Sequence, residues 1–125
     1  MLPVVQGRIG LVNAIRDLTM MDYVVSVPLV DNQPYDLVVE IDGILNKVSV
    51  KSTRSKSNTG YPTVQVGDIR SNKTTNVVRK FDPSKSDYLY IYAIGVGSWL
   101  IPSNCVLVGR MLTVDSRFDR FRISC

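Results

Sequence analysis

The sequence contains no histidine, and this absence removes several kinds of catalytic and metal-binding site. Without histidine the chain has neither a Cys/His zinc site nor a histidine general base. The two cysteines, Cys105 and Cys125, lack the paired spacing of a zinc site. Cys105 lies in an apolar run, so we interpret it as part of the core rather than as a reactive thiol.

Long hydrophobic runs are missing as well. No stretch of about 18 or more apolar residues occurs, and the start, MLPVVQGRIG, lacks the charged-then-apolar pattern of a secretory signal. We therefore expect a soluble intracellular protein with no membrane partner. With 125 residues, 45% of them hydrophobic, the chain can bury one core but is too short for two domains of ordinary size. We predict a single domain over residues 1–125.

Positive charge is concentrated in one segment. Residues 51–80 contain seven Lys and Arg residues and one acidic residue, whereas residues 1–50 contain three basic and six acidic residues. We favour nucleic-acid binding over a merely solvated loop surface, because so many uncompensated charges exceed what solubility requires. The candidate phosphate and sugar contacts, interleaved with Ser, Thr, Asn and Gly, are Lys51, Arg54, Lys56, Tyr61, Arg70, Lys73, Arg79 and Lys80.

Hydrophobic periodicity predicts a helix followed by three strands. The helical pattern covers RIGLVNAIRDLTMM, residues 8–21. Three strand patterns follow: YVVSVPLV (23–30), YDLVVEI (35–41) and LNKVSVKS (45–52). Further along, DYLYIYAIG alternates tyrosines with aliphatic residues, which indicates a strand buried on both faces rather than a base-stacking platform.

The dipeptide Asp42-Gly43 predicts a tight hairpin, because both residue types tolerate the positive φ of a type I′ turn. The resulting register brings Asp36 opposite Ser49. Strand alternation then places Asp36 and Lys51 on the same face as diagonal neighbours. These two residues can be solvated catalytic groups or an ordinary surface ion pair, and the pair alone does not decide between the two.

The order of these segments resembles the PD-(D/E)XK nuclease superfamily, in which an aspartate begins one strand and a (D/E)-x-K triplet lies on the next. The run QPYDLVVEIDGILNKVSVKST is most similar to the small homing endonucleases encoded in bacterial and phage group I introns, and it also resembles archaeal Holliday-junction resolvases. Matching helix and strand segments, among them VGDIRSNKTTNVVRKFD and SDYLYIYAIGVGSWLIP, extend the resemblance over residues 7–102. The resemblance implies an α/β fold, a mixed β-sheet flanked by helices.

The resemblance also implies a role for several residues. Asp36 matches the metal-binding aspartate, and the backbone carbonyl of Val50 would supply a further oxygen ligand to Mg²⁺. Lys51 matches the lysine of the triplet and would stabilise charge on the phosphorus or orient the attacking water. Ser49 stands where the family has Asp or Glu, or in the intron group often Gln. Leu11 stands where the leading helix would carry a glutamate.

The implied activity is Mg²⁺-dependent hydrolysis of double-stranded DNA by a site-specific homing-type endonuclease in the cytoplasm of a bacterial or phage-infected cell. Because so small a chain covers only a short stretch of duplex, recognition of a long site would require a homodimer or homotetramer. One alternative, favoured by Leu11 and Ser49, is a DNA-binding protein on a nuclease scaffold without activity. Another is a structural or RNA-binding role that rests on the basic segment alone. Glu40, roughly 13 Å along the strand from Asp36, is expected to be structural or to pair with Lys47.

Overall fold

The computed structural model describes residues 1–30, 32–67, 69–71, 76–78, 80–106 and 109–123. The described part contains one α-helix, α1 (Pro3–Met20), and two 3₁₀ helices, η1 (Ser103–Cys105) and η2 (Ser116–Phe121). No helix in these ranges is long and apolar enough to cross a membrane. The strands are β1 (Val24–Ser26), β2 (Leu37–Ile41), β3 (Ile44–Thr53), β4 (Thr63–Gln65), β5 (Ile69–Ser71), β6 (Asn76–Val78), β7 (Tyr88–Ala93), β8 (Gly97–Pro102) and β9 (Met111–Thr113).

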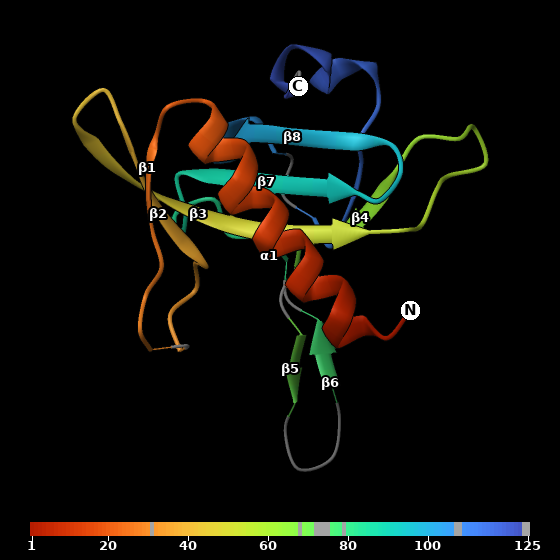
Figure 1. Cartoon of the computed structure of the whole chain (residues 1–125). Helices are drawn as coiled ribbons and strands as arrows, with labels where there is room; N and C mark the ends of the chain where they lie inside the picture. Colours follow the sequence, from red (N-terminus) through yellow and green to blue (C-terminus); the bar gives the residue numbers. More distant parts are fainter. Residues whose placement is uncertain (31, 68, 72–75, 79, 107–108, 124–125) are drawn as a thin grey trace.

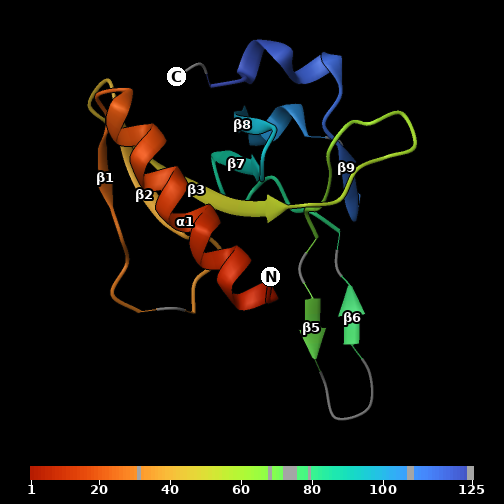
Figure 2. The same cartoon turned by 45° about the vertical axis from the view of Figure 1, so that its right-hand side comes forward.

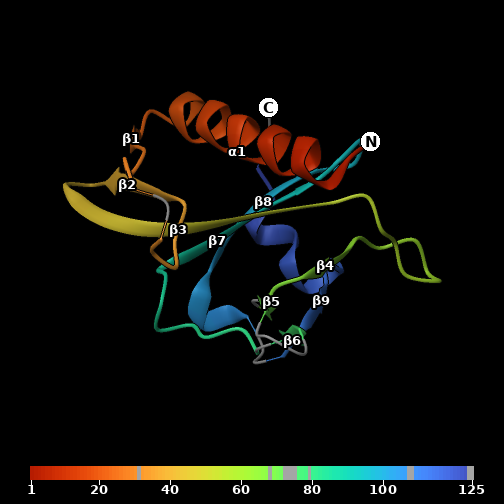
Figure 3. The same ribbon diagram turned by 90° about the horizontal axis from the view of Figure 1, so that it is seen from below.

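Five strands form a mixed sheet in the order β1-β2-β3-β7-β8 (Figure 1). β3 and β7 are parallel, and the other neighbouring strands of this sheet are antiparallel. α1 lies across one face, whereas the β4–β9 pair and η2 lie on the other (Figure 3). The β5–β6 pair lies apart from the main sheet (Figure 2). The α/β fold with a mixed sheet is therefore confirmed.

α1 begins at Pro3, five residues before the predicted start at Arg8. Proline is favoured in the first turn of a helix because its missing N–H needs no partner there. The inner face of the helix packs closely on β3 at Gly10, where a Cβ would lie 2.8 Å from the Cβ of Ser52. Gln6 Nε2 donates to the Ser52 carbonyl (3.1 Å), and Ser52 Oγ donates to the Gln6 carbonyl (3.0 Å). These contacts fix the first half of α1 against the strand that carries Lys51.

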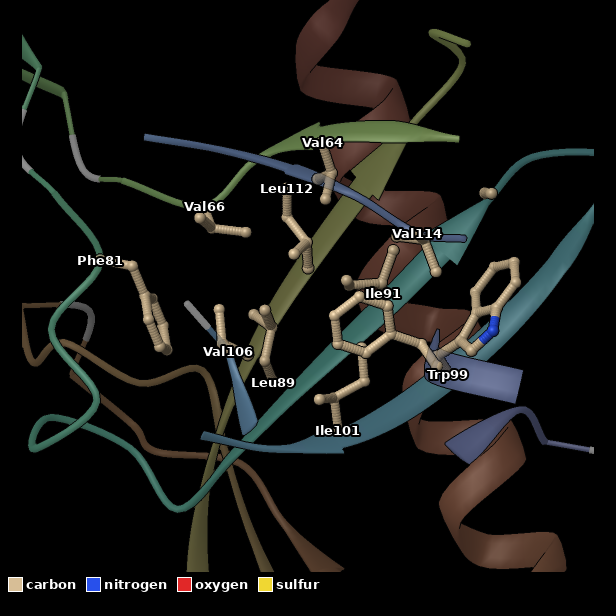
Figure 4. Close-up of a cluster of buried hydrophobic side chains, with 12 residues drawn as sticks. Val64, Val66, Phe81, Leu89, Ile91, Trp99, Ile101, Val106, Leu112 and Val114 are labelled. Carbon is tan, nitrogen blue, oxygen red and sulfur yellow. The ribbon is translucent and has the colours of Figure 1, made fainter. Parts of the chain in front are cut away.

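Two hydrophobic clusters lie on opposite faces of the main sheet. Strand β7 contributes to both, with its tyrosines facing α1 and its aliphatic residues facing away, so the predicted burial of this strand on both faces is confirmed. Each fully buried Leu or Ile contributes about 1.5–3 kcal/mol relative to an exposed position. The cluster between α1 and the sheet contains Ala14, Leu18, Leu37, Val39, Val48, Tyr90 and Leu100. The second cluster, shown in Figure 4, includes Val66, Phe81, Leu89, Ile91, Trp99, Ile101, Val106 and Leu112. Cys105 is half-buried against this second cluster, next to its core rather than inside it.

The predicted hairpin is present with its predicted register. Asp42 and Gly43 have φ values of 52° and 80°, as a type I′ turn requires. The pairing runs back from the turn to Glu40 opposite Leu45 and Leu37 opposite Val48. Of the two predictions for Glu40, the ion pair with Lys47 is not found among the described residues. The Lys47 ammonium lies instead over the Tyr35 ring, 5.6 Å from its centroid.

Candidate active site

The segment that enters β2 is attached to β3 by both backbone and side-chain hydrogen bonds. The backbone N–H of Asp36 donates to the Val48 carbonyl (2.9 Å), so the regular ladder ends one residue before the predicted pair of Asp36 with Ser49. Asp36 Oδ2 accepts a hydrogen bond from the backbone N–H of Val50 (2.7 Å). Ser49 Oγ donates to the Pro34 carbonyl (3.2 Å). Asp36 thus takes the place of a backbone partner just before β2 begins at Leu37, with its carboxylate at the edge of β3.

The carbonyl of Val50 lies at the same edge as this carboxylate. In an extended strand the N–H and C=O groups of one residue point to the same side. Since the Val50 N–H bonds to Asp36, the Val50 carbonyl also points toward the Asp36 segment. The two oxygen atoms that the sequence suggested as metal ligands are therefore on one edge of β3.

Asp36, Ser49 and Lys51 line one pocket with a volume of about 150 Å³. Typical small-molecule sites are larger, about 300–1,000 Å³, so this pocket suits a hydrated ion or a phosphate group. Its apolar wall is formed by Val66 and Phe81, two members of the second hydrophobic cluster (Figure 4). The pocket lies between the hairpin and that cluster, on the side of the sheet away from α1.

The loop before β7 forms another wall of this pocket, through Asp82, Lys85 and Ser86. Asp82 Oδ1 accepts hydrogen bonds from the Ser84 N–H (2.9 Å) and from Ser84 Oγ (2.6 Å). These two bonds lower the pKa of the exposed Asp82 carboxyl below its usual range, which favours the ionised form at neutral pH. Sequence reasoning missed this loop. The dipeptide Asp82-Pro83 is a recognisable turn signal, but it does not reveal that the turn meets the hairpin.

The profile of a protein family described as PD-(D/E)XK endonuclease matches residues 4–104. The chain belongs to the PD-(D/E)XK endonuclease family. Its fold is similar to that of a bacterial homing endonuclease, I-Ssp6803I, with a TM-score of 0.81 and 25% identity over 96% of this chain and 88% of that chain. No curated protein sequence matches significantly. The family and fold implied by the sequence are confirmed, and the membership supports a nuclease function with DNA as substrate.

The oxygen atoms at this pocket are of the kind that binds a hard cation. Mg²⁺ in proteins is usually held by one or two carboxylates and keeps several waters, which substrate phosphates complement. The carboxylate of Asp36, the carbonyl of Val50 and the hydroxyl of Ser49 are ligands of this class. Within the described ranges no group of three or more His, Cys, Asp or Glu side chains could enclose an ion, so water and phosphate would complete the coordination.

The two residues that depart from the family pattern, Ser49 and Leu11, lie on opposite sides of the sheet. Ser49 is buried at the pocket, with its hydroxyl engaged by the Pro34 carbonyl. Leu11 packs into the cluster between α1 and the sheet, and no α1 residue is among the residues that line the pocket. In this chain α1 supports β3 from behind and contributes no acidic group to the described pocket walls.

Most of the predicted DNA-contacting residues lie outside the pocket. Arg54, Lys56 and Tyr61 are exposed in the segment after β3, which projects beyond the end of that strand (Figure 1). Lys80 is exposed just before the loop that carries Asp82. Arg70 lies in β5, but its side chain is outside the described part of the chain. Lys73 and Arg79 also lie outside the described residues.

One buried carboxylate was not anticipated from the sequence. Asp17 on α1 is 2% exposed and accepts hydrogen bonds from the Tyr90 hydroxyl (2.6 Å), Ser98 Oγ (2.7 Å) and Asn13 Nδ2 (3.3 Å). Burial, and next the hydrogen bond to Asp17, raise the pKa of the Tyr90 hydroxyl well above its usual value. This network ties α1 to β7 and β8, so Asp17 has a structural role on the face away from the pocket.

Proposed function

We propose that this protein is a Mg²⁺-dependent endonuclease that hydrolyses phosphodiester bonds in double-stranded DNA, with Asp36, Ser49 and Lys51 at its centre. The observation that carries the proposal is that these three residues line one pocket beside the start of β2. They are the positions that match the aspartate and the triplet of the PD-(D/E)XK motif. A pocket of about 150 Å³ suits a metal ion with one phosphate group.

Asp36 and Lys51 have distinct tasks in this reaction. A bound Mg²⁺ would supply Lewis-acid polarisation of the scissile phosphate and a water of lowered pKa. Asp36 directs its carboxylate to the edge of β3, where its bond to the Val50 N–H restricts its rotamer. Lys51 stabilises the negative charge that develops on the phosphate oxygens, an effect that is strong where protein walls exclude water. Val66 and Phe81 provide such a wall.

The substrate would be a specific DNA site, as in homing-type endonucleases. The similarity to a bacterial homing endonuclease supports this part of the proposal. Exposed basic residues after β3, Arg54 and Lys56 among them, suit contacts to the phosphate backbone on either side of the cleaved bond. We further propose that the chain is a single domain that acts as a homodimer or homotetramer in the cytoplasm of a bacterial or phage-infected cell, because symmetry lets a small subunit recognise a long site.

Incubation of the purified protein with supercoiled plasmid DNA tests the proposal. The expected result is nicked or linear plasmid with Mg²⁺ and none with EDTA. Because the target site is unknown, the assay uses several large plasmids and bacteriophage DNA, and Mn²⁺ as a second metal. Wild-type protein that binds these DNAs but leaves them all intact with both metals would contradict the enzymatic proposal.

That result would favour a second function, a DNA-binding protein on a nuclease scaffold. The specific observation behind it is Ser49, whose short side chain replaces an acidic ligand and already donates to the Pro34 carbonyl. DNA affinity that falls steeply with salt, in the absence of cleavage, would be its signature.

A further inference from the structure

The pocket contains two carboxylate and lysine pairs that come from separate segments. Asp36 and Lys51 belong to the hairpin region, whereas Asp82 and Lys85 belong to the loop before β7. All four residues line the same volume of about 150 Å³. The hairpin alone provides a single carboxylate there, because the position two residues before Lys51 is serine.

We propose that Asp82 is the second carboxylate ligand of the metal site and supplies the charge that Ser49 lacks. This inference rests on the proposed function, since it concerns the same pocket and the same ion. It assigns a catalytic role to a residue outside the aspartate and triplet of the family motif.

The fold explains why this loop reaches the pocket. β7 is parallel to β3, and its first residue, Tyr88, pairs with Val48. The loop that leads into β7 therefore reaches β3 beside Lys47 and Val48, next to Ser49. Asp87 fixes this entry, because its N–H donates to the Lys47 carbonyl (2.9 Å) and its Oδ2 accepts from the Lys47 N–H (2.8 Å).

The loop is also held at its other end. Phe81 is buried in the second hydrophobic cluster, and its N–H donates to the Gly109 carbonyl (2.8 Å). Ser86 is buried and bonds to Ser103 Oγ (3.3 Å). Asp82 follows Phe81 directly, so the hydrophobic cluster fixes the backbone at Asp82, and the two bonds from Ser84 hold its carboxylate. A ligand attached to a packed residue is positioned more precisely than one on an unsupported loop.

The orientation of the Asp82 carboxylate is compatible with an ion in the pocket. Within the described residues, both hydrogen bonds to this group go to Oδ1, from the N–H and the hydroxyl of Ser84. Oδ2 remains as the oxygen for coordination. With two carboxylates and two lysines the pocket is close to neutral, so a divalent ion would give it the positive charge that attracts a phosphodiester.

Binding of Mn²⁺, measured by electron paramagnetic resonance of the free ion, tests this assignment on four proteins. They are wild type, Asp36→Asn, Asp82→Asn and Asp42→Asn. The last is a matched control, because it removes the same charge at the exposed hairpin turn, where asparagine also tolerates positive φ. We expect Asp36→Asn and Asp82→Asn each to weaken Mn²⁺ binding by at least about 10-fold, and Asp42→Asn to bind like wild type.

A rescue experiment separates ligand loss from misfolding. The asparagine side chain of the Asp82→Asn protein retains an Oδ1 that can accept both Ser84 bonds, so the melting temperature in EDTA should match that of wild type. Ser49→Glu, added to Asp82→Asn, introduces a carboxylate at the same pocket and should recover most of the lost Mn²⁺ affinity. The same Ser49→Glu change should rescue the cleavage rate of the Asp82→Asn protein.

The outcomes distinguish failure of this inference from failure of the proposed function. Wild-type Mn²⁺ affinity in Asp82→Asn, together with loss of affinity in Asp36→Asn, would overturn the role of Asp82 and leave the proposed function intact. A wild-type protein that neither binds Mn²⁺ nor cuts DNA would overturn both. If Asp82→Asn binds Mn²⁺ weakly and the added Ser49→Glu change does not restore the affinity, the proposal that Asp82 supplies the carboxylate missing at position 49 would also be contradicted.

Discussion

The carboxylate of Asp36 accepts a 2.7 Å hydrogen bond from the backbone N–H of Val50, the residue immediately before Lys51. This bond connects the aspartate that we propose as a metal ligand with the residue between Ser49 and Lys51, and the Val50 carbonyl points to the same edge of β3. The carboxylate is therefore positioned by the backbone of the strand that also carries the lysine.

Replacement of Lys51 by methionine should lower the cleavage rate by about 10²–10³-fold, because a positively charged donor to the developing phosphate charge is lost. Mn²⁺ affinity should remain near that of wild type, since an ammonium group is not a metal ligand. Lys47→Met is the matched control, because Lys47 is on the same strand and lies over Tyr35, outside the pocket. Equal cleavage rates for the two variants would remove Lys51 from the chemistry.

The close packing of α1 on β3 predicts opposite effects at two glycines of one helix. A Cβ at Gly10 would lie 2.8 Å from the Cβ of Ser52, whereas one at Gly7 meets nothing within 4 Å. Both alanine variants gain about 1 kcal/mol of helix propensity, but Gly10→Ala also incurs about 1–3 kcal/mol of overpacking. Urea denaturation should therefore find Gly7→Ala more stable than Gly10→Ala by about 1–3 kcal/mol, and equal stabilities would mean that α1 does not pack on Ser52 as described.

The alkaline stability of the protein should depend on Tyr90. Its pKa is raised in the folded state, so the unfolded chain loses this proton first, and the free energy of unfolding should fall as the pH rises through about 10. Tyr90→Phe removes this contribution and should show a shallower decline between about pH 9 and 11. It should also be less stable near neutral pH, by about 1–3 kcal/mol, because buried Asp17 loses a hydrogen-bond donor.

Tyr92→Phe provides the comparison for this measurement. Tyr92 lies on the same strand and face, and the described residues include no hydrogen-bond partner for its hydroxyl. Denaturation curves across this pH range for the two variants and wild type supply the check. If the free energy of unfolding of Tyr90→Phe falls with rising pH as steeply as that of wild type, the buried network around Asp17 would be contradicted.

The hairpin was predictable because local rules determine it. Asp42-Gly43 fixes the turn, and the period of two along each strand then assigns Asp36 and Lys51 to the same face. The helix was predictable from its apolar period, but its start was not, because Pro3 and the exposed apolar residues after it do not add to that period.

The rest of the site depends on contacts that no local pattern encodes. Asp82 joins the pocket only because β7 pairs in parallel with β3, and the pairing of distant strands cannot be read from short-range alternation. Asp17 occupies the buried face of α1 as a polar residue, and only its bonds to Tyr90 and Ser98 make that position acceptable. The short strands β4, β5, β6 and β9 have three residues each, too few to show a period.

The most direct test of the proposed catalytic centre is the rate at which Asp36→Asn cuts plasmid DNA in Mg²⁺, measured beside wild type and Asp42→Asn. We predict that Asp36→Asn is at least about 100-fold slower, because a metal ligand is lost. Its DNA affinity, measured by fluorescence anisotropy, should be unchanged or slightly higher, because one negative charge is removed. Asp42→Asn should cut like wild type. Cleavage by Asp36→Asn at the wild-type rate would show that the catalytic centre lies elsewhere in the molecule.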